Sequence, residues 1–486
     1  MNFTSPAFLF AFLPLCTVLY YVVPPSARAV RNAILLAASF LFYGIGEPSF
    51  VIVLALSVVI NWVFGLFVAP GKRHRKSVLA FGLAGNVLLL FRFKYAAFAI
   101  SQLNAAIGSQ LVVPNIVLPL GISFFTFQSM SYLVDVYRGN AAVRRNPFEV
   151  ALYVAFFPQL VAGPIVRYET VASEISGRRE TLLDFSEGLN RFVEGLAKKV
   201  LLANPMGTLA DAAFDGTNLY PTYFGAHGVP PVLAWLGAIA YTFQIYFDFS
   251  GYSDMAIGLG RMFGFHFLEN FRHPYVSFSV SEFWRRWHIS MGTWFRDYVY
   301  FPLGGSRVKT KFRLTANLFT VWILTGLWHG ANWTFVVWGI MYFALIALEK
   351  CVGSTQRLYL TAIGRTAGIF YTMFFVLIGW VVFRSPSLSS AKVYLASMFG
   401  LTEGNWNDPR SAFLLRENLS VFMLASVFAT PLPLFLRAFL VRRANLQPTW
   451  RPIISVLKEI WHPILFVCSL SCVAKGMHNP FIYFNF

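Results

Sequence analysis

Charged side chains are scarce in this chain of 486 residues, because Asp, Glu, Lys and Arg make up only 12% of it. A soluble protein of similar size carries roughly 25% charged residues. Hydrophobic residues account for 57% of the chain, and long apolar runs recur from end to end. These runs are continuous rather than alternating, which argues against a transmembrane β-barrel. The composition therefore predicts an all-α polytopic membrane protein.

Several signatures of soluble enzymes are also absent from the sequence. It contains no Gly-rich phosphate loop with Lys and Ser/Thr, no H-E-x-x-H and no G-x-S-x-G. The four cysteines and the histidines lack zinc-like spacing, so we expect no disulfide framework, no bound cofactor and no protein-bound metal. No Lys or Arg precedes Arg28, so the basic region of a signal peptide is missing and residues 1–24 are expected to stay as a first span.

Apolar segments divide the chain without any tandem repeat or soluble insert. They fall at about 7–24, 32–46, 50–69, 78–100, 112–134, 150–166, 231–247, 315–349, 366–383, 418–440 and 453–474. We treat 1–486 as one membrane domain, with a core over 1–450 and a C-terminal span and tail over 451–486.

The net charge of +18 resides mainly in short loops between apolar runs. This distribution indicates the positive-inside bias of membrane proteins rather than nucleic-acid binding. Loops 70–77, 305–313 and 441–451 are therefore expected in the cytoplasm. The N- and C-termini are then both expected on the outer side of the membrane.

The segment LWHGANW (327–333) places a histidine in one of the most apolar parts of the chain. No Asp, Glu, Lys or Arg occurs between Arg313 and Glu349, and basic loops flank this run on both sides. Its 35 residues would span about 52 Å as a helix. We predict a hairpin that breaks at membrane depth, near Gly326 and Gly330, with His329 close to its apex.

His329 is a candidate functional residue because an ionisable group at membrane depth is costly. An imidazole suits general-base catalysis near neutral pH. A neutral histidine that is hydrogen-bonded between helices remains the structural alternative.

A second polar segment is EFWRRWHISMGTWFRDYVYFPLGG (282–305). Helical spacing would place Arg286, Ser290, Thr293 and Asp297 on one stripe. The Trp and Tyr residues favour an interfacial or re-entrant helix. Arg285 and Arg286 could attract a phosphate-bearing donor, although a simple anchoring helix is the alternative.

Two further segments interrupt apolar runs. In YFDFSGYSDMAIGLG (246–260), Asp248 and Asp254 would not share a helix face, so their spacing does not favour a catalytic acid pair. We predict a helix break with internal hydrogen bonds there. FFPQLVAGPIVRYE (156–169) is predicted to form an architectural, re-entrant element.

Together these segments resemble the membrane-bound O-acyltransferase (MBOAT) family. The blocks at 282–305 and TGLWHGANWTFVVWG resemble its two signature blocks. LPLGISFFTFQSMSYLVDVYRG (118–139), FFPQLVAGPIVR and YFDFSGYSDMAIGLG narrow the similarity to the bacterial alginate O-acetylation branch. The resemblance implies a ring of about 11–12 transmembrane helices, with re-entrant and interfacial helices, around a central tunnel. It also implies a location in the bacterial inner membrane.

The resemblance places His329 at the family's catalytic histidine and His288 at its second signature position, which is Asn in many eukaryotic members. It implies acyl transfer from a cytoplasmic thioester, expected to be acetyl-CoA, for O-acetylation of an extracellular polysaccharide. A separate periplasmic transferase is the expected partner. We expect these residues to line the substrate path: Trp284, Arg285, Arg286, Ser290, Trp328, Asn332, Asp248, Tyr252 and Asn270.

The end of the chain, NPFIYFNF (479–486), resembles the small single-span companion of the teichoic acid D-alanylation system. By that resemblance Tyr483 would carry the acyl group, whereas an aromatic membrane anchor is the alternative. D-alanyl transfer, acylation of a lipid or small molecule, and a transporter with His329 in a proton relay are alternative functions.

Overall fold

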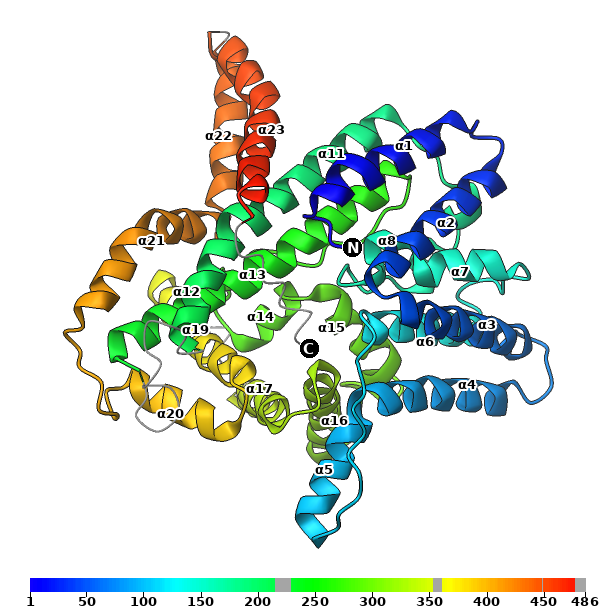
Figure 1. Cartoon of the computed structure of the whole chain (residues 1–486), viewed down its shortest axis with the longest axis horizontal. Coiled ribbons are helices and arrows are strands. Elements are labelled where there is room, and N and C mark those ends of the chain that lie inside the picture. Colours follow the sequence, from blue (N-terminus) through cyan, green and yellow to red (C-terminus); the bar gives the residue numbers. More distant parts are fainter. Residues whose placement is uncertain (215–228, 353–360, 448, 477–486) are drawn as a thin grey trace. The chain divides into compact units, whose positions relative to one another are not determined.

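The computed structural model describes residues 1–214, 229–352, 361–447 and 449–476, and these residues form helices and loops without a β-strand (Figure 1). Among them, eight helices are long and apolar enough to cross a membrane. The prediction of an all-α polytopic membrane protein is therefore confirmed. Several expected spans instead form shorter helices, such as α6 (Ile122–Arg138), which overlaps only the second half of the apolar segment 112–134. The tail that contains Tyr483 lies outside the described residues.

Contacts between residues divide the chain into two units. The first contains Met1–Phe192, Tyr252–Glu269 and Arg296–Val299, and the second contains Val193–Gly251, Asn270–Phe295 and Tyr300–Phe486. Two helices, α11 (Leu182–Ala197) and α13 (Pro231–Met262), contribute residues to both. Each unit is thus built from segments that are far apart in the sequence.

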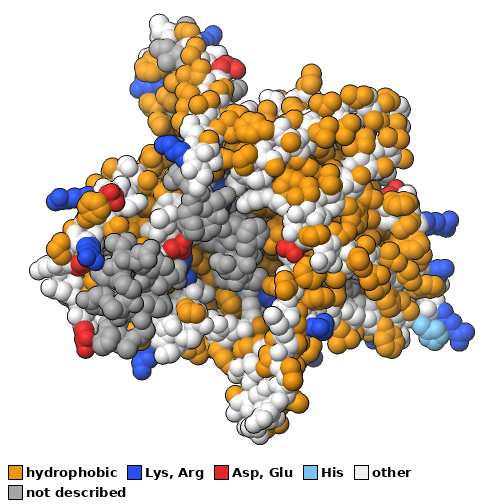
Figure 2. Space-filling view, in the orientation of Figure 1, with side chains coloured by type: hydrophobic (Ala, Val, Ile, Leu, Met, Phe, Trp, Pro, Cys, Tyr) orange, Lys and Arg blue, Asp and Glu red, His pale blue; other side chains and the backbone are white. Residues whose placement is uncertain are grey.

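The first unit consists mainly of the N-terminal helices. Its helices are α1 (Leu13–Val22), α2 (Arg28–Gly46), α3 (Val51–Val68), α4 (Arg75–Leu90), α5 (Ala96–Ile107), α6, α7 (Pro147–Ala155), α8 (Phe157–Leu160), α9 (Tyr168–Val171) and α10 (Glu174–Gly177). Helices α3, α4 and α6 pack on one another, and α2 packs on α7. Apolar side chains dominate the surface over α2 and α3 (Figure 2), where Ile52, Leu56 and Phe67 are exposed. A surface of this kind suits contact with lipid.

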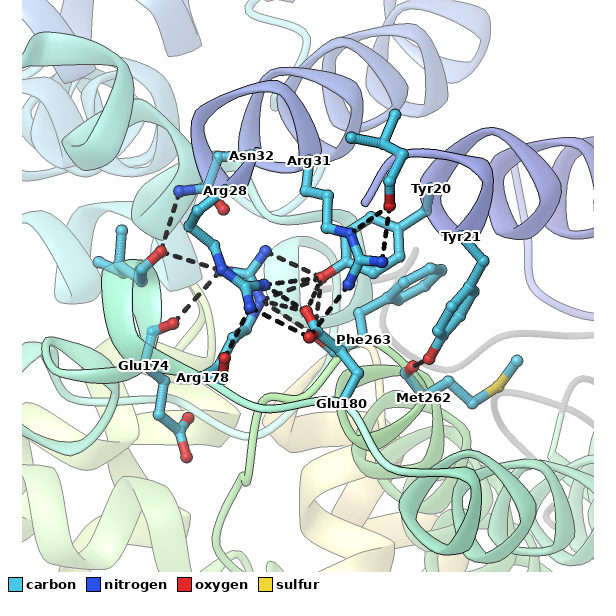
Figure 3. Close-up of polar contacts among 12 residues, drawn as sticks. Tyr20, Tyr21, Arg28, Arg31, Asn32, Glu174, Arg178, Glu180, Met262 and Phe263 are labelled. Carbon is cyan, nitrogen blue, oxygen red and sulfur yellow. Dashed lines mark hydrogen bonds and ion pairs between the residues drawn. The ribbon is translucent and has the colours of Figure 1, made fainter. Parts of the chain in front are cut away.

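The buried carboxylate of Glu180 holds three segments of the first unit together (Figure 3). It forms ion pairs with Arg28, with Arg31 at 3.1 Å and with Arg178 at 3.5 Å, and it accepts a hydrogen bond from Tyr20. Burial by itself raises the pKa of this carboxyl, but the hydrogen bonds from Arg28 and Tyr20 outweigh it and lower the pKa to about 2. The α1–α2 hairpin is thereby fastened to the loop before α11.

The second unit contains the remaining helices. They are α12 (Asn204–Phe214), α14 (Val280–Arg286), α15 (Ile289–Phe295), α16 (Lys311–His329), α17 (Trp333–Val352), α19 (Ala362–Arg384), α20 (Leu388–Met398), α21 (Pro409–Phe428), α22 (Leu432–Leu446) and α23 (Trp450–Ala474). Helices α16 and α17 pack side by side, as do α22 and α23 (Figure 1). The apolar segment 418–440 is divided between α21 and α22 by a break at 429–431.

Helix α13 corrects one prediction, because it runs unbroken through Asp248 and Asp254. Each carboxylate instead has a cationic partner within its own unit. In the second unit Lys199 Nζ lies 2.8 Å from Asp248 Oδ1, and in the first Arg191 pairs with Asp254 at 2.6 Å. The buried charges are thus compensated by side chains from other segments, so the helix can continue.

Candidate active site

His329 is the last residue of α16, and its side chain lies inside the second unit with only 8% of the residue exposed. Three aromatic rings surround the imidazole. Their centroids lie 4.9 Å (Trp328), 5.1 Å (Trp338) and 5.0 Å (Phe383) from its own. Carbonyl groups at a helix C-terminus favour a positive charge nearby. The imidazole therefore lies at the helix terminus whose carbonyl groups stabilise a cation.

Two glycines allow α16 and α17 to approach closely enough to form this hairpin. A Cβ atom on Gly326 would lie 2.4 Å from the carbonyl oxygen of Phe335, and one on Gly339 would lie 2.5 Å from that of Trp322. The predicted break is present, because α16 ends at His329 and α17 begins at Trp333.

Asn332 builds the turn between the two helices. Its Oδ1 accepts a hydrogen bond from the Thr334 N–H at 3.1 Å, and its Nδ2 donates to the carbonyl oxygen of Pro386 at 2.8 Å. Both ends of the amide are therefore engaged in holding the turn. This geometry does not favour a role for Asn332 in contacting substrate.

The segment 282–305 is not one helix, so the predicted polar stripe is wrong. Helix α14 ends at Arg286, Trp287 is extended, and α15 begins at Ile289. The break lies at His288, whose φ of 44° is left-handed. Left-handed backbone is strained for most side chains, but Asn and His adopt it several-fold more often than average. Position 288 therefore requires a residue that tolerates a left-handed backbone, in addition to any role of its imidazole.

Asn270 and Ser290 hold the His288 side chain. The Nδ1 atom of His288 lies 3.1 Å from Asn270 Oδ1, and the Oγ of Ser290 donates to the same oxygen at 2.9 Å. The residue is 1% exposed, and Phe249 packs edge-on against its ring at 4.5 Å. These three polar residues form a compact buried cluster.

Aromatic rings connect this cluster to His329. The ring centroid of Trp328 lies 5.9 Å from that of His288 and 4.9 Å from that of His329. Trp284, from α14, packs against Trp338 at 5.3 Å. The two histidines therefore share a buried, aromatic environment.

Other predicted site residues lie elsewhere. Arg285 is exposed, and Arg286 pairs with Glu282 at 2.5 Å. Tyr252 stacks on Phe3 in the first unit, with ring centroids 4.6 Å apart. Arg286 thus has a partner other than the histidines, and Tyr252 belongs to the first unit.

Glu349 is a residue of the site whose role was missed in the sequence. Its carboxylate, on α17, accepts hydrogen bonds from the backbone N–H groups of Val280 at 2.6 Å and Ser281 at 2.8 Å. These are the first two residues of α14, whose N–H groups lack partners within the helix. Glu349 therefore anchors α14 to the hairpin. The only signal was its position as the first charge after the long uncharged run.

Comparisons with known proteins identify the family of this chain. The family model for membrane-bound O-acyltransferases matches residues 120–390, which include both histidines. The chain is 39% identical to "Probable alginate O-acetylase AlgI" of Pseudomonas putida, over 100% of both chains. It is 43% identical to the Pseudomonas aeruginosa protein of that name, over 84% of this chain and 76% of the relative.

Other relatives act on different polymers, according to their names. The chain is 31% identical to "Peptidoglycan O-acetyltransferase" of Helicobacter pylori, over 100% of this chain and 97% of the relative. It is 28% identical to "Teichoic acid D-alanyltransferase" of Streptococcus thermophilus, over 46% of this chain and 54% of the relative. The extent of the family match and these identities lead to one conclusion: the chain is a multi-pass membrane O-acyltransferase that belongs to the MBOAT family and is similar to alginate O-acetylases.

Proposed function

We propose that this enzyme takes an acetyl group from a cytoplasmic thioester, acetyl-CoA, and passes it across the membrane for O-acetylation of an extracellular or periplasmic polysaccharide. The names of the relatives support a polysaccharide as the final acceptor. The observation that carries the chemical part is the buried imidazole of His329 at the apex of the α16–α17 hairpin.

In the proposed reaction His329 acts as general base. An unassisted alcohol or phenol is a weak nucleophile near neutral pH, so a base must take its proton as it attacks. The hydroxyl oxygen bonds to the thioester carbonyl carbon while its proton moves to the imidazole. The tetrahedral intermediate then collapses, the C–S bond breaks, and the leaving thiolate takes the proton from the imidazolium. The products are an ester and a free thiol.

The negative charge on the carbonyl oxygen of the intermediate needs a hydrogen-bond donor. Trp338 is the candidate that the structure supports best. Its ring packs on His329 at 5.1 Å, and its buried Nε1 has no hydrogen-bond partner among the described residues. An indole nitrogen carries only a donor N–H, so it can serve an oxyanion.

The distribution of charge supports the proposed direction of transfer. The basic loops 70–77, 305–313 and 441–451 would face the cytoplasm and attract the phosphates of the donor. Both termini would then lie on the periplasmic side of the inner membrane, where a separate transferase would receive the group.

Tyr483 is proposed as the hydroxyl that receives the acetyl group. A phenol, with a pKa near 10, is a better leaving group than an alkyl alcohol, so its ester can pass the group onward. Replacement Tyr483→Phe removes only the hydroxyl. Loss of polymer acetylation supports this role, whereas wild-type acetylation in Tyr483→Phe assigns the acceptor hydroxyl elsewhere.

The proposal can be tested in inverted membrane vesicles supplied with radiolabelled acetyl-CoA, with and without a separate periplasmic transferase. We expect label on the enzyme first and on polymer only when the transferase is present. A His329→Gln enzyme is the matched control. Absence of CoA release by wild-type enzyme would contradict acetyl-CoA as the donor.

D-alanyl transfer is the second candidate, because a teichoic acid D-alanyltransferase shares 28% identity over about half of each chain. Its donor would be a carrier-protein thioester. Parallel incubations with D-alanyl carrier protein and with acetyl-CoA distinguish the two donors.

A further inference from the structure

The amide of Asn270 has a defined orientation beside His288. The backbone N–H of Ser290 lies 3.2 Å from the atom assigned as Asn270 Oδ1. A backbone N–H can only donate a hydrogen bond, so the atom facing it must be the acceptor oxygen and not the NH₂ group. The Ser290 hydroxyl donates to the same oxygen at 2.9 Å. Ser290 thus fixes which end of the amide faces the imidazole.

This orientation determines where the proton of the neutral imidazole resides. The Ser290 hydroxyl also lies 3.4 Å from His288 Nδ1, but it donates its hydrogen to the Asn270 oxygen at the shorter distance of 2.9 Å. The Asn270 oxygen has no proton to give, so the His288 Nδ1 atom, 3.1 Å away, carries the hydrogen that joins them. Burial among aromatic rings disfavours the charged imidazolium. A neutral ring that is protonated on Nδ1 has only a lone pair on Nε2.

That lone pair has no partner within the described structure. The Nε2 atom of His288 is buried and makes no hydrogen bond to any described residue. A buried polar atom without a partner costs about 1–3 kcal/mol. The left-handed backbone of His288 adds strain, which commonly marks functional positions. A buried, strained and unsatisfied acceptor points to a ligand that supplies a donor.

We infer that Asn270 is a positioning residue that holds His288 in the Nδ1–H tautomer, so that its Nε2 accepts a hydrogen bond from an O–H or N–H group of a bound substrate. This inference rests on the proposed function for the identity of the substrates. Two donor groups that lie near the reacting carbonyl have this chemistry: the acceptor hydroxyl, and the amide N–H closest to the sulfur in the pantetheine arm of a thioester donor. In this tautomer the neutral ring cannot stabilise an oxyanion through Nε2, which separates its role from that of Trp338.

The tautomer can be measured without any catalytic assay. The full-length enzyme in lipid bilayers, labelled with ¹⁵N in its histidine rings, would be examined by solid-state NMR. The His288 signals would be assigned by their loss in His288→Asn, a residue suited to the left-handed backbone. We expect a protonated Nδ1 and an unprotonated Nε2.

Two variants at position 270 separate positioning from packing. Asn270→Asp keeps an acceptor oxygen and should preserve the Nδ1–H signal, whereas Asn270→Leu has similar size without an acceptor and should lose it. A wild-type ring protonated on Nε2, or an unchanged spectrum in folded Asn270→Leu, would overturn the inference.

Thiol-release kinetics then identify the substrate group. The acetyl thioester of N-acetylcysteamine carries the amide N–H, and S-butyl thioacetate lacks it. If the amide binds Nε2, the wild-type preference for the first thioester disappears in His288→Asn and His288→Ala. If the acceptor hydroxyl binds, both thioesters slow by the same factor of at least tenfold. Rates within threefold of wild type for both thioesters would contradict the role of Nε2 in substrate binding. The NMR measurement reports the tautomer even if the enzyme accepts neither thioester. Failure of the tautomer inference can therefore be told apart from failure of the proposed function.

Discussion

The imidazole of His329 and the indole of Trp338 pack edge to face, with their ring centroids 5.1 Å apart. Phe383, on α19, meets the imidazole at a similar angle and a distance of 5.0 Å. Apolar contacts from α17 and α19 therefore set the orientation of the ring. Substitution of the imidazole can remove a base while leaving these helices packed.

The first prediction concerns His329. His329→Gln keeps a polar side chain of similar length but no basic nitrogen, so acyl transfer should fall by about 10²–10⁴-fold, the usual contribution of a positioned general base. The rate of thiol release by purified enzyme measures this, with size-exclusion chromatography as the check on folding. A rate within about threefold of wild type would remove His329 from the role of base.

The second prediction concerns the backbone at His288. His288→Val should lower the free energy of unfolding by about 1–2 kcal/mol more than His288→Asn, because a β-branched residue tolerates left-handed φ poorly. Both variants remove the imidazole, so the comparison isolates the backbone. Thermal unfolding in one detergent measures the difference. Equal stabilities would show that this position is unstrained.

The third prediction concerns the α16–α17 hairpin. Gly326→Ala and Gly339→Ala should each lower the unfolding temperature, because the added methyl group would meet a backbone carbonyl at about 2.5 Å. Gly85→Ala is the matched control, since a Cβ there has no neighbour within 4 Å. The control should unfold at or slightly above the wild-type temperature. A loss of stability in the control equal to that in Gly326→Ala would contradict the close approach.

The fourth prediction concerns pH and Glu180. Its pKa is depressed from 4.5 to about 2 in the folded protein, so its stabilising contribution is present above about pH 4.5 and is lost as the pH falls towards 2. Glu180→Gln should therefore destabilise the protein at pH 7 by about 3 kcal/mol or more, because three arginines lose their shared carboxylate. The difference between wild type and variant should shrink below pH 4.5. Unfolding at pH 7 and pH 3 measures it, and a difference independent of pH would contradict the ion pairs.

The fifth prediction concerns orientation in the membrane. After replacement of the native cysteines, a cysteine at position 74 should react with an impermeant maleimide only when the cytoplasmic face is accessible. A cysteine placed in the 46–49 loop serves as the opposite control. Labelling of position 74 from the outer face of intact cells would reverse the proposed topology.

The hairpin was predictable from the sequence because its signals are local. The uncharged run ends at basic loops, and its glycines lie where the break occurs. The continuity of α13 was not predictable, because Asp248 is compensated by Lys199, which is 49 positions away in the chain. The residues around Asp248 in the sequence indicate that a buried carboxylate is costly, but they do not reveal its distant partner.

The two histidines show the same difference between local signals, which the sequence reveals, and contacts that form only on folding. Both were recognisable as candidates, but the break at His288 depends on one left-handed residue, which no periodicity reveals. Its hydrogen bond to Asn270 requires a turn that brings residues 18 positions apart together. The anchoring of α14 by Glu349 likewise connects segments whose relation exists only after folding.

The Glu180 cluster constrains the order in which the chain assembles during synthesis. Arg28 and Arg31 are synthesised with the first two helices, but the carboxylate that pairs with Arg28 is 152 residues further along the chain. At about 5–20 residues per second, translation reaches Glu180 roughly 8–30 s later. Until then the first hairpin carries two arginines without that partner, so it cannot complete its native contacts alone. The N-terminal helices are therefore inserted early and become fixed late, when the ribosome has already made more than a third of the protein.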